Sequence, residues 1–391
     1  MKKRVLLSSV LAVLTIIASH AEAEAIADTN TAKAENGSPE KKEEVFSKPK
    51  VSGFFIGQYQ FSDPDGESSN TLSVRMLRLT VTGRILNDFQ YTVQGQASGN
   101  TENLSDSPRL LDANIEWQKF NQFKVKAGQF KLPFTFDNAS NPIDVGFTNF
   151  SQGRQKLVNA SDRSGARSSN GRDIGVQIQG DLFPGSDGHS FLHYQVGVFN
   201  GQGTNTKDVD NQKDIVGGIW IAPINGLRIG VFGWTGSYAR QGTITDEDGS
   251  THTGVLKVDK QRYAFGAEYS KNDYLFRAEY IHNTGYGFKT QASKDDSESD
   301  LTINTSNGNK ADAFYALASV PVIGKKGFIR ARYDLYRKAA KWDSSKTQYE
   351  LQFKYILHKN LIVALEYALV NDRTLEDHNY NLVDAQFIVR F

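Results

Sequence analysis

The sequence predicts an all-β fold, a transmembrane antiparallel β-barrel of sixteen strands, from three observations. Apolar and polar side chains alternate in stretches of about ten residues, the length that a tilted strand needs to cross an outer membrane. Short turns and longer loops follow these stretches in alternation. The final stretch, 383–391, places an apolar side chain at every second position up to Phe391, so one face suits lipid and the other suits water.

Residues 1–23 have the layout of a secretory signal peptide. A basic start at 2–4 precedes an apolar stretch over 5–18, and small residues follow at Ala21 and Ala23. The apolar stretch is shorter than the roughly 18 residues of a membrane-spanning helix, which disfavours the alternative of an N-terminal anchor. We therefore expect the mature chain to be exported.

Residues 24–50 are rich in Ala, Glu, Lys, Ser and Pro, and no apolar period runs through them. Charge-rich segments of this kind are usually solvated, so we expect a periplasmic N-terminal tail or short helix. An arm that binds a partner is the alternative. The barrel itself is expected over 51–391.

Composition excludes several classes of protein. The chain has no cysteine, which excludes thiolate metal sites and cysteine nucleophiles. Its 45 basic and 44 acidic residues nearly cancel, so long-range attraction of nucleic acid is not expected. Any charge selectivity therefore has to be local.

Alternation with a period of two residues identifies the strands. In 89–98, for example, Phe89, Tyr91 and Val93 alternate with glutamine and threonine. Because unpaired backbone groups are not tolerated in hydrocarbon, such strands have to close on themselves, and sixteen of them enclose an aqueous lumen. The expected strands are 51–61, 72–86, 89–98, 109–118, 123–131, 173–183, 191–199, 214–222, 227–238, 261–269, 273–282, 311–320, 327–336, 347–357, 361–369 and 382–391.

The connections between these strands alternate in length. Those after even-numbered strands are short, such as 87–88 and 358–360, whereas those after odd-numbered strands are mostly longer, such as 239–260 and 283–310. An even-stranded barrel with both termini in the periplasm requires this rhythm. A soluble β-sandwich, the alternative, has no reason to keep it.

Charged side chains of both signs fall on the face expected to line the lumen, where they filter ions or, alternatively, only solvate the wall and pair with one another. The basic members expected along the pore wall are Arg78, Arg84, Lys124, Lys126, Arg330 and Arg332, with Arg228, Arg262, Arg277 and Lys354. The acidic members are Asp112, Glu116, Asp173, Asp181, Glu268, Glu279, Asp334, Glu350, Glu366 and Asp384. Candidates for the aromatic girdles at the membrane interfaces are Trp117, Trp220, Trp234, Tyr263, Tyr269, Tyr274 and Tyr280.

The connection 132–172 is the longest, and loops of that length without structure of their own are usually functional. Its second half carries five cationic side chains against one acid, Asp162. We expect the segment to fold into the barrel and form a cationic constriction that binds anions. If it lies outside, the same side chains are expected to bind lipopolysaccharide phosphates or a neighbouring subunit. The five residues are Arg154, Lys156, Arg163, Arg167 and Arg172.

No catalytic or metal-binding pattern accompanies the predicted barrel. The histidines are scattered, with no metal-ligand spacing and no serine or aspartate partner at a recognisable offset. The acidic cluster within 295–300 is expected to be a solvated loop rather than a divalent-ion site. We expect neither an enzymatic activity nor a cofactor.

Several motifs resemble landmarks of the phosphate-selective porin O and P family. They are the segments 128–134 (GQFKLPF), 171–176 (GRDIGV) and 197–203 (GVFNGQG). The pair Arg75 and Arg78 is similar to the arginine-rich second strand of that family, and the segment 330–334 (RARYD) is similar to a late Arg-Tyr strand. The resemblance runs in consistent order over 51–391.

This resemblance implies a sixteen-stranded porin in the outer membrane of a Gram-negative bacterium, usually a homotrimer, with a long loop in the pore and a basic lining that favours phosphate or other anions. The implied partners are small anionic solutes, outer-membrane lipid and lipopolysaccharide. Two features depart from the family pattern: Arg75 falls on the lipid side by alternation, and the lumen charges nearly balance.

Function is therefore expected to be passive diffusion of small solutes with a preference for anions. A general porin that selects mainly by size is one alternative. A structural or adhesive protein with a plugged barrel is the other.

Overall fold

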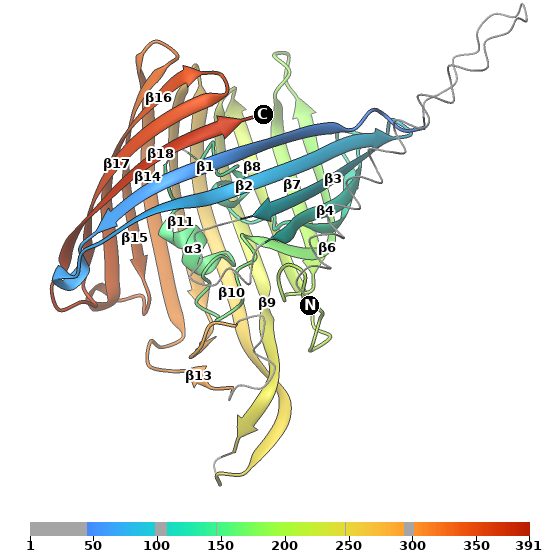
Figure 1. Ribbon diagram of the computed structural model, residues 1–391. Coiled ribbons are helices and arrows are strands. Elements are labelled where there is room, and N and C mark those ends of the chain that lie inside the picture. Colours follow the sequence, from blue (N-terminus) through green and yellow to red (C-terminus); the bar gives the residue numbers. More distant parts are fainter. Residues whose placement is uncertain (1–44, 98–107, 146, 247, 293–300) are drawn as a thin grey trace, which may run out of the picture.

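Sixteen antiparallel strands form a closed barrel, as the sequence predicts (Figure 1). The structure is a computed structural model that describes residues 45–97, 108–145, 147–246, 248–292 and 301–391. The expected signal peptide and residues 24–44 of the expected tail lie outside the described residues. No helix in the described part of the chain is long and apolar enough to cross a bilayer.

The strands of the barrel agree with the predicted ranges at most of their ends. They are β1 (Lys50–Ser62), β2 (Ser69–Ile85), β3 (Phe89–Ala97), β4 (Arg109–Trp117), β5 (Lys124–Lys131), β6 (Arg172–Pro184), β7 (Ser190–Phe199), β8 (Asp214–Ile224), β9 (Leu227–Thr245), β10 (Thr251–Lys271), β11 (Tyr274–Thr284), β14 (Lys310–Ile323), β15 (Gly327–Arg337), β16 (Ser345–His358), β17 (Leu361–Asp372) and β18 (Asn379–Arg390).

Each barrel strand pairs with its neighbours in the chain, and β1 pairs with β18 to complete the ring. The start of β1, the end of β18 and the short turns therefore share one end of the barrel, which is the periplasmic end in proteins of this architecture. The longer connections lie at the other, extracellular end.

Two of these longer connections contain β-structure that the sequence did not predict. Residues 239–260, expected to be a loop, continue β9 and β10 as a hairpin whose pairing reaches Thr245 and Thr251. Figure 1 shows this yellow ribbon projecting beyond the barrel. Period-two alternation fades there because strands outside the membrane have no lipid face. In the next connection, β12 (Gly287–Phe288) and β13 (Ile303–Asn304) form a separate two-stranded sheet.

The outer face of the barrel is apolar, as lipid contact requires. Phe265, Leu351 and Leu365 are exposed there, whereas Glu350, on the opposite face of β16, is buried. At the periplasmic end Trp117 packs edge-on against Phe120, with 5.6 Å between ring centroids, as expected of an interfacial girdle.

Two of the predicted girdle residues lie inside the barrel instead. Trp234 is 2% exposed and belongs to an internal apolar cluster, and Trp220 stacks on the His193 ring at 3.8 Å and packs against the same cluster. Trp234 is an even-numbered residue of β9, like the predicted lumen residue Arg228, and Trp220 pairs with an even-numbered residue of β9 across the β8–β9 ladder. Alternation therefore places both tryptophans on the lumen face.

Candidate functional site

Residues 132–171 connect β5 to β6 and contact strands across the barrel. The first anchor is Glu279 on β11. Its two carboxylate oxygens accept the backbone N–H groups of Phe136 and Asp137, at 2.5 and 2.9 Å, where the short helix α2 (Phe136–Ala139) begins. The Tyr315 hydroxyl donates to the same carboxylate at 2.6 Å. Free N–H groups at a helix start are satisfied in this way.

Two further wall carboxylates hold the middle of the loop. Glu366 on β17 accepts the backbone N–H of Thr148, and Asp334 on β15 accepts that of Gln152, both at 2.9 Å. Gln152 begins the helix α3 (Gln152–Leu157). Three acids expected to balance cations in the lumen therefore accept hydrogen bonds from the loop backbone.

An ion pair holds the returning part of the loop. Arg262 on β10 donates to both carboxylate oxygens of Asp162, at 2.9 and 2.7 Å, and neither side chain is exposed. Burial alone would raise the pKa of the Asp162 carboxyl, but Arg262 and the backbone N–H groups of Ser164 and Asn159 lower it to about 2. Asp162 is therefore ionised at neutral pH.

An apolar core lies between the loop and the wall. Phe134 packs edge-on against Trp234 at 5.6 Å between centroids, and Phe136 packs in the same way against Phe232 at 5.2 Å. Leu157 of α3 is fully buried in this cluster. Burying these side chains together stabilises the loop in its position.

Arg75, expected on the lipid side, contacts the loop instead. The ladder between β1 and β2 shifts register here: Ile56 pairs with Met76, and Gly57 pairs with Val74. Arg75 is the extra residue of this bulge, and a bulge re-aims a side chain that strict alternation would place outside. Its guanidinium donates to the Thr148 carbonyl and, at 2.9 Å, to Asn149 Oδ1.

Four cationic side chains meet where the loop adjoins β2, β4 and β6. They are Arg78 of β2, Lys131 at the end of β5, Arg154 of α3 and Arg172 at the start of β6, each within electrostatic range of the others. We call these four residues the cationic cluster. Two carboxylates act on it: Asp112 of β4, which pairs with Arg172, and Asp137 of α2, which is within electrostatic range of Arg154.

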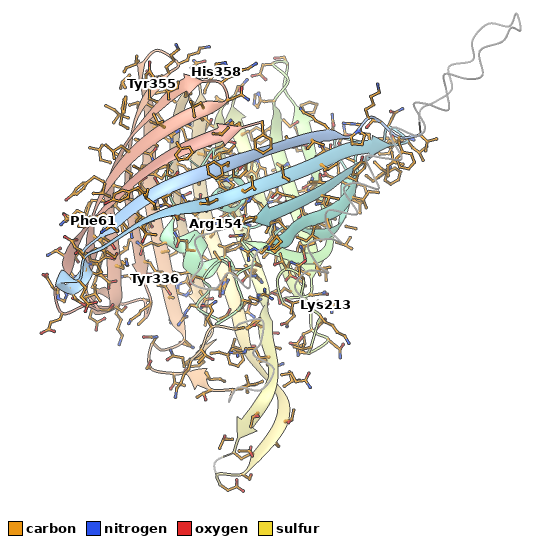
Figure 2. All side chains as sticks on the ribbon, in the orientation of Figure 1. Phe61, Arg154, Lys213, Tyr336, Tyr355 and His358 are labelled. Carbon is orange, nitrogen blue, oxygen red and sulfur yellow. The ribbon has the colours of Figure 1, made fainter. Side chains whose placement is uncertain are left out.

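The contacts of the cationic cluster are mostly with neutral groups. Arg172 forms a two-point contact with Asp112, at 2.9 and 3.0 Å. Arg78 donates to the Gln96 amide oxygen at 2.7 Å. Arg154 lies 3.3 Å above the Phe150 ring and donates to a backbone carbonyl, and its buried Nε has no hydrogen-bond partner among the described residues. Figure 2 labels Arg154 within the barrel.

The arginines of the cationic cluster are shielded from water, and the cluster's four positive charges outnumber the two acids that act on it. Lys131 donates to the carbonyls of Ala139 and Ser140, so it too has no carboxylate partner among the described residues. Arg78, Arg154 and Arg172 are each only 2% exposed.

The structure brings together only some of the residues predicted for the constriction. Arg154 and Arg172 lie in the cationic cluster. Arg163 donates to the carbonyls of Gly285 and Gly308 near the extracellular end, and Lys156 lies on the same side of the loop. Arg167 is half-buried on the same segment.

Among the residues predicted for the pore wall, only Arg78 joins the cationic cluster. Lys124 and Lys126 pair with Asp181 and Glu116 at 3.0 and 3.5 Å.

Three further predicted wall residues have partners of their own. Arg84 donates to the Asn87 carbonyl at the β2–β3 turn. Arg330 donates to Ser319 and Gln352, and Arg332 donates to Glu350.

Sequence reasoning missed Lys131. It is an odd-numbered residue on a strand whose lumen-facing residues are even-numbered. At the end of a strand, however, alternation no longer fixes the direction of a side chain. Its place in the segment 128–134, directly before the long loop, was the available signal. No group of three or more metal-ligating side chains occurs within the described ranges.

Comparison with known proteins agrees with this architecture. The family model for phosphate-selective porin O and P matches residues 51–253, just over half of the chain. No curated protein matches the chain.

Solved structures share the fold at low sequence identity. An anion-selective porin from Comamonas acidovorans is 15% identical with a TM-score of 0.60, over 88% of this chain and all of that one. OmpF of Salmonella typhi, in complex with daunomycin, is 12% identical with a TM-score of 0.62, over 88% of this chain and 97% of that one. A trimer form of OmpT from Vibrio cholerae is 12% identical with a TM-score of 0.55, over 89% of this chain and 100% of that one.

Proposed function

Because this chain belongs to the phosphate-selective porin O and P family, and is thus a porin of the Gram-negative outer membrane, we propose that anions pass preferentially through its cationic cluster. Solutes diffuse down their gradient, and no cofactor or enzymatic step takes part. One structural neighbour is an anion-selective porin, which supports the same preference.

The observation that carries the proposal is the charge imbalance of the cationic cluster. Arg78, Lys131 and Arg154 contact amide oxygens, carbonyls or an aromatic ring, and among the described residues only Arg172 forms an ion pair, with Asp112. Asp137 is within electrostatic range of Arg154, so two acids face four cations. Buried cations without counter-charges are costly, and a transiting anion lowers that cost. Several weak contacts in series also let the anion leave.

Other predicted residues take secondary places in this proposal. Lys124 and Lys126 line the approach from the periplasm, although their charges are paired. Arg163 and Lys156 belong to the extracellular approach. Arg332 positions the loop rather than the solute, because its partners are Glu350 and the Asn149 carbonyl.

Reversal potentials across a planar bilayer under a KCl gradient test the proposal. We expect an anion-selective sign for the wild-type protein and a clear shift toward zero for R78Q/R154Q. The matched control is K325Q/K326Q, which removes the same charge from the exposed periplasmic turn between β14 and β15. A cation-selective wild-type channel would overturn the proposal. So would an R78Q/R154Q channel with wild-type selectivity.

One observation favours a second candidate, a barrel with a plugged lumen and a structural or adhesive role. The arginines of the cationic cluster are almost fully buried, so the lumen is tightly packed at this level. Single-channel recording decides between the two: conductance steps support the porin, and their absence at every voltage supports the plug.

We also propose a homotrimer that contacts outer-membrane lipid and lipopolysaccharide through its apolar outer face. The trimer form of OmpT, a neighbour of the same fold, supports this assembly. Native mass spectrometry in detergent tests it, and a monomer that persists at high concentration would contradict it.

A further inference from the structure

A polar pocket of about 390 Å³ lies between the long loop and the extracellular ends of β15 and β16. Gln152, Lys156 and Arg163 contribute from the loop. The segment that contains β12 contributes Lys289, and the end of β15 contributes Lys338. The volume falls in the range in which proteins hold small organic molecules and exceeds what one inorganic anion fills.

The acids that line this pocket are already paired. Asp162 binds Arg262, as described above, and Asp372 lies 3.5 Å from the ammonium group of Lys346. Neither carboxylate forms an ion pair with the remaining pocket cations, although Asp162 is within electrostatic range of Lys156 and Arg163.

The remaining cations of the pocket lack carboxylate partners among the described residues. Lys289 and Lys338 form no ion pair there, and Lys156 contacts only the Ser161 hydroxyl, at 3.4 Å. Arg163 donates to two backbone carbonyls, Gly285 at 2.9 Å and Gly308 at 3.1 Å. The pocket thus presents positive charge from three different segments.

Neutral groups between these cations suit a ligand with hydroxyl groups. Asn304, Asn307 and Gln291 line the pocket. The Gln291 amide nitrogen donates to the Ala166 carbonyl and Asn304 Oδ1 accepts from Ser306, which leaves the Gln291 amide oxygen, the Asn304 amide nitrogen and the Asn307 side chain for a ligand. The ring of Tyr336 adds an aromatic surface, on which the carbon skeleton of a sugar packs.

We propose that this pocket binds a small organic phosphate of the sugar-phosphate class on its way to the cationic cluster. The ammonium groups would hold the phosphate, and the amides would hold the hydroxyl groups. The proposal rests on the proposed function, because it names the class of anion that the porin would admit.

Isothermal titration of the full-length protein in detergent tests this pocket. The probes are glucose 6-phosphate, inorganic phosphate and glucose. We expect glucose 6-phosphate to bind more tightly than either of the others. In K289Q/K338Q its affinity should fall by roughly tenfold, the effect of two screened charge-assisted contacts. K325Q/K326Q, with the same charge change at the periplasmic end, should stay within about twofold of the wild type.

Two results would overturn the proposal: glucose 6-phosphate that binds no more tightly than inorganic phosphate, or K289Q/K338Q with wild-type affinity. The single variant K289Q, at an exposed position, replaces the double variant if that one does not fold, and a weaker fall is then expected. Reversal potentials of the wild type distinguish failure of the pocket proposal from failure of the porin proposal. An anion-selective channel without the pocket effect refutes only the pocket, whereas a cation-selective channel refutes the porin proposal itself.

Discussion

The carboxylate of Asp162 forms a two-point ion pair with the guanidinium of Arg262, and both side chains are fully shielded from solvent. One partner belongs to the long loop and the other to β10. The pair therefore joins the loop to the wall directly.

Removing one charge of this pair should destabilise the barrel. D162N leaves Arg262 buried without a counter-charge, which typically costs about 3–5 kcal/mol. Thermal unfolding followed by circular dichroism measures the loss. The control is D187N, at an exposed turn, for which we expect a change near zero. If D162N has the same Tm as D187N, the ion pair does not hold the loop.

Stability should also depend on pH through Asp162. Its folded pKa of about 2 lies below its ordinary value of 3.8, so its ionisation favours the folded state at any pH above 3.8. That contribution, about 2–3 kcal/mol, is lost as the pH falls from 4 through 2. The difference in Tm between wild type and D162N should be constant above pH 4 and shrink toward pH 2. A difference that does not change over this range would contradict the pKa.

The apolar core under the loop should control both stability and pore size. F134A removes a fully buried ring that packs on Trp234, which costs about 3–5 kcal/mol. Because the loop then loses its packing, single-channel conductance should rise. F265A changes a lipid-facing ring and should leave conductance unaltered. Equal conductance in F134A and the wild type would show that the loop keeps its place without this contact.

The bulge residue Arg75 should steady the middle of the loop. R75A leaves the Thr148 carbonyl and the Asn149 side chain without a charged donor, and bonds of that kind contribute about 1.5–3 kcal/mol each. We expect a lower Tm and greater open-channel noise. R84A, which removes an exposed arginine at a turn, is the control. Wild-type noise in R75A would mean that the loop is held by its other contacts alone.

The sequence alone predicted the strands well because lipid on one side and water on the other impose a strict period. Phe265 and Arg262, three positions apart on β10, show this: one is exposed to lipid and the other is buried inside. The prediction failed where that contrast stops, in the β9–β10 hairpin beyond the membrane and at the bulge that turns Arg75 inward.

The candidate site was less predictable, because it depends on which charges meet. Alternation placed Glu279, Asp334 and Glu366 on the lumen face but gave no sign that loop N–H groups occupy them. Likewise, Arg154 and Lys156 are two residues apart and were grouped together. Residues two positions apart point to different sides of a helix. Because both lie on α3, Arg154 reaches the cationic cluster and Lys156 reaches the extracellular pocket.

The pairing of β1 with β18 has a consequence for assembly. It joins the two ends of the barrel domain, as in the pairing of Phe54 with Arg390. β1 therefore cannot complete its hydrogen bonds until β18, the last strand, is in place. The anchors of the long loop lie on β11, β15 and β17, all later in the chain than the loop itself. The β1–β18 seam and the loop anchors therefore both join segments that are far apart in the sequence. Such late, long-range contacts make folding slow.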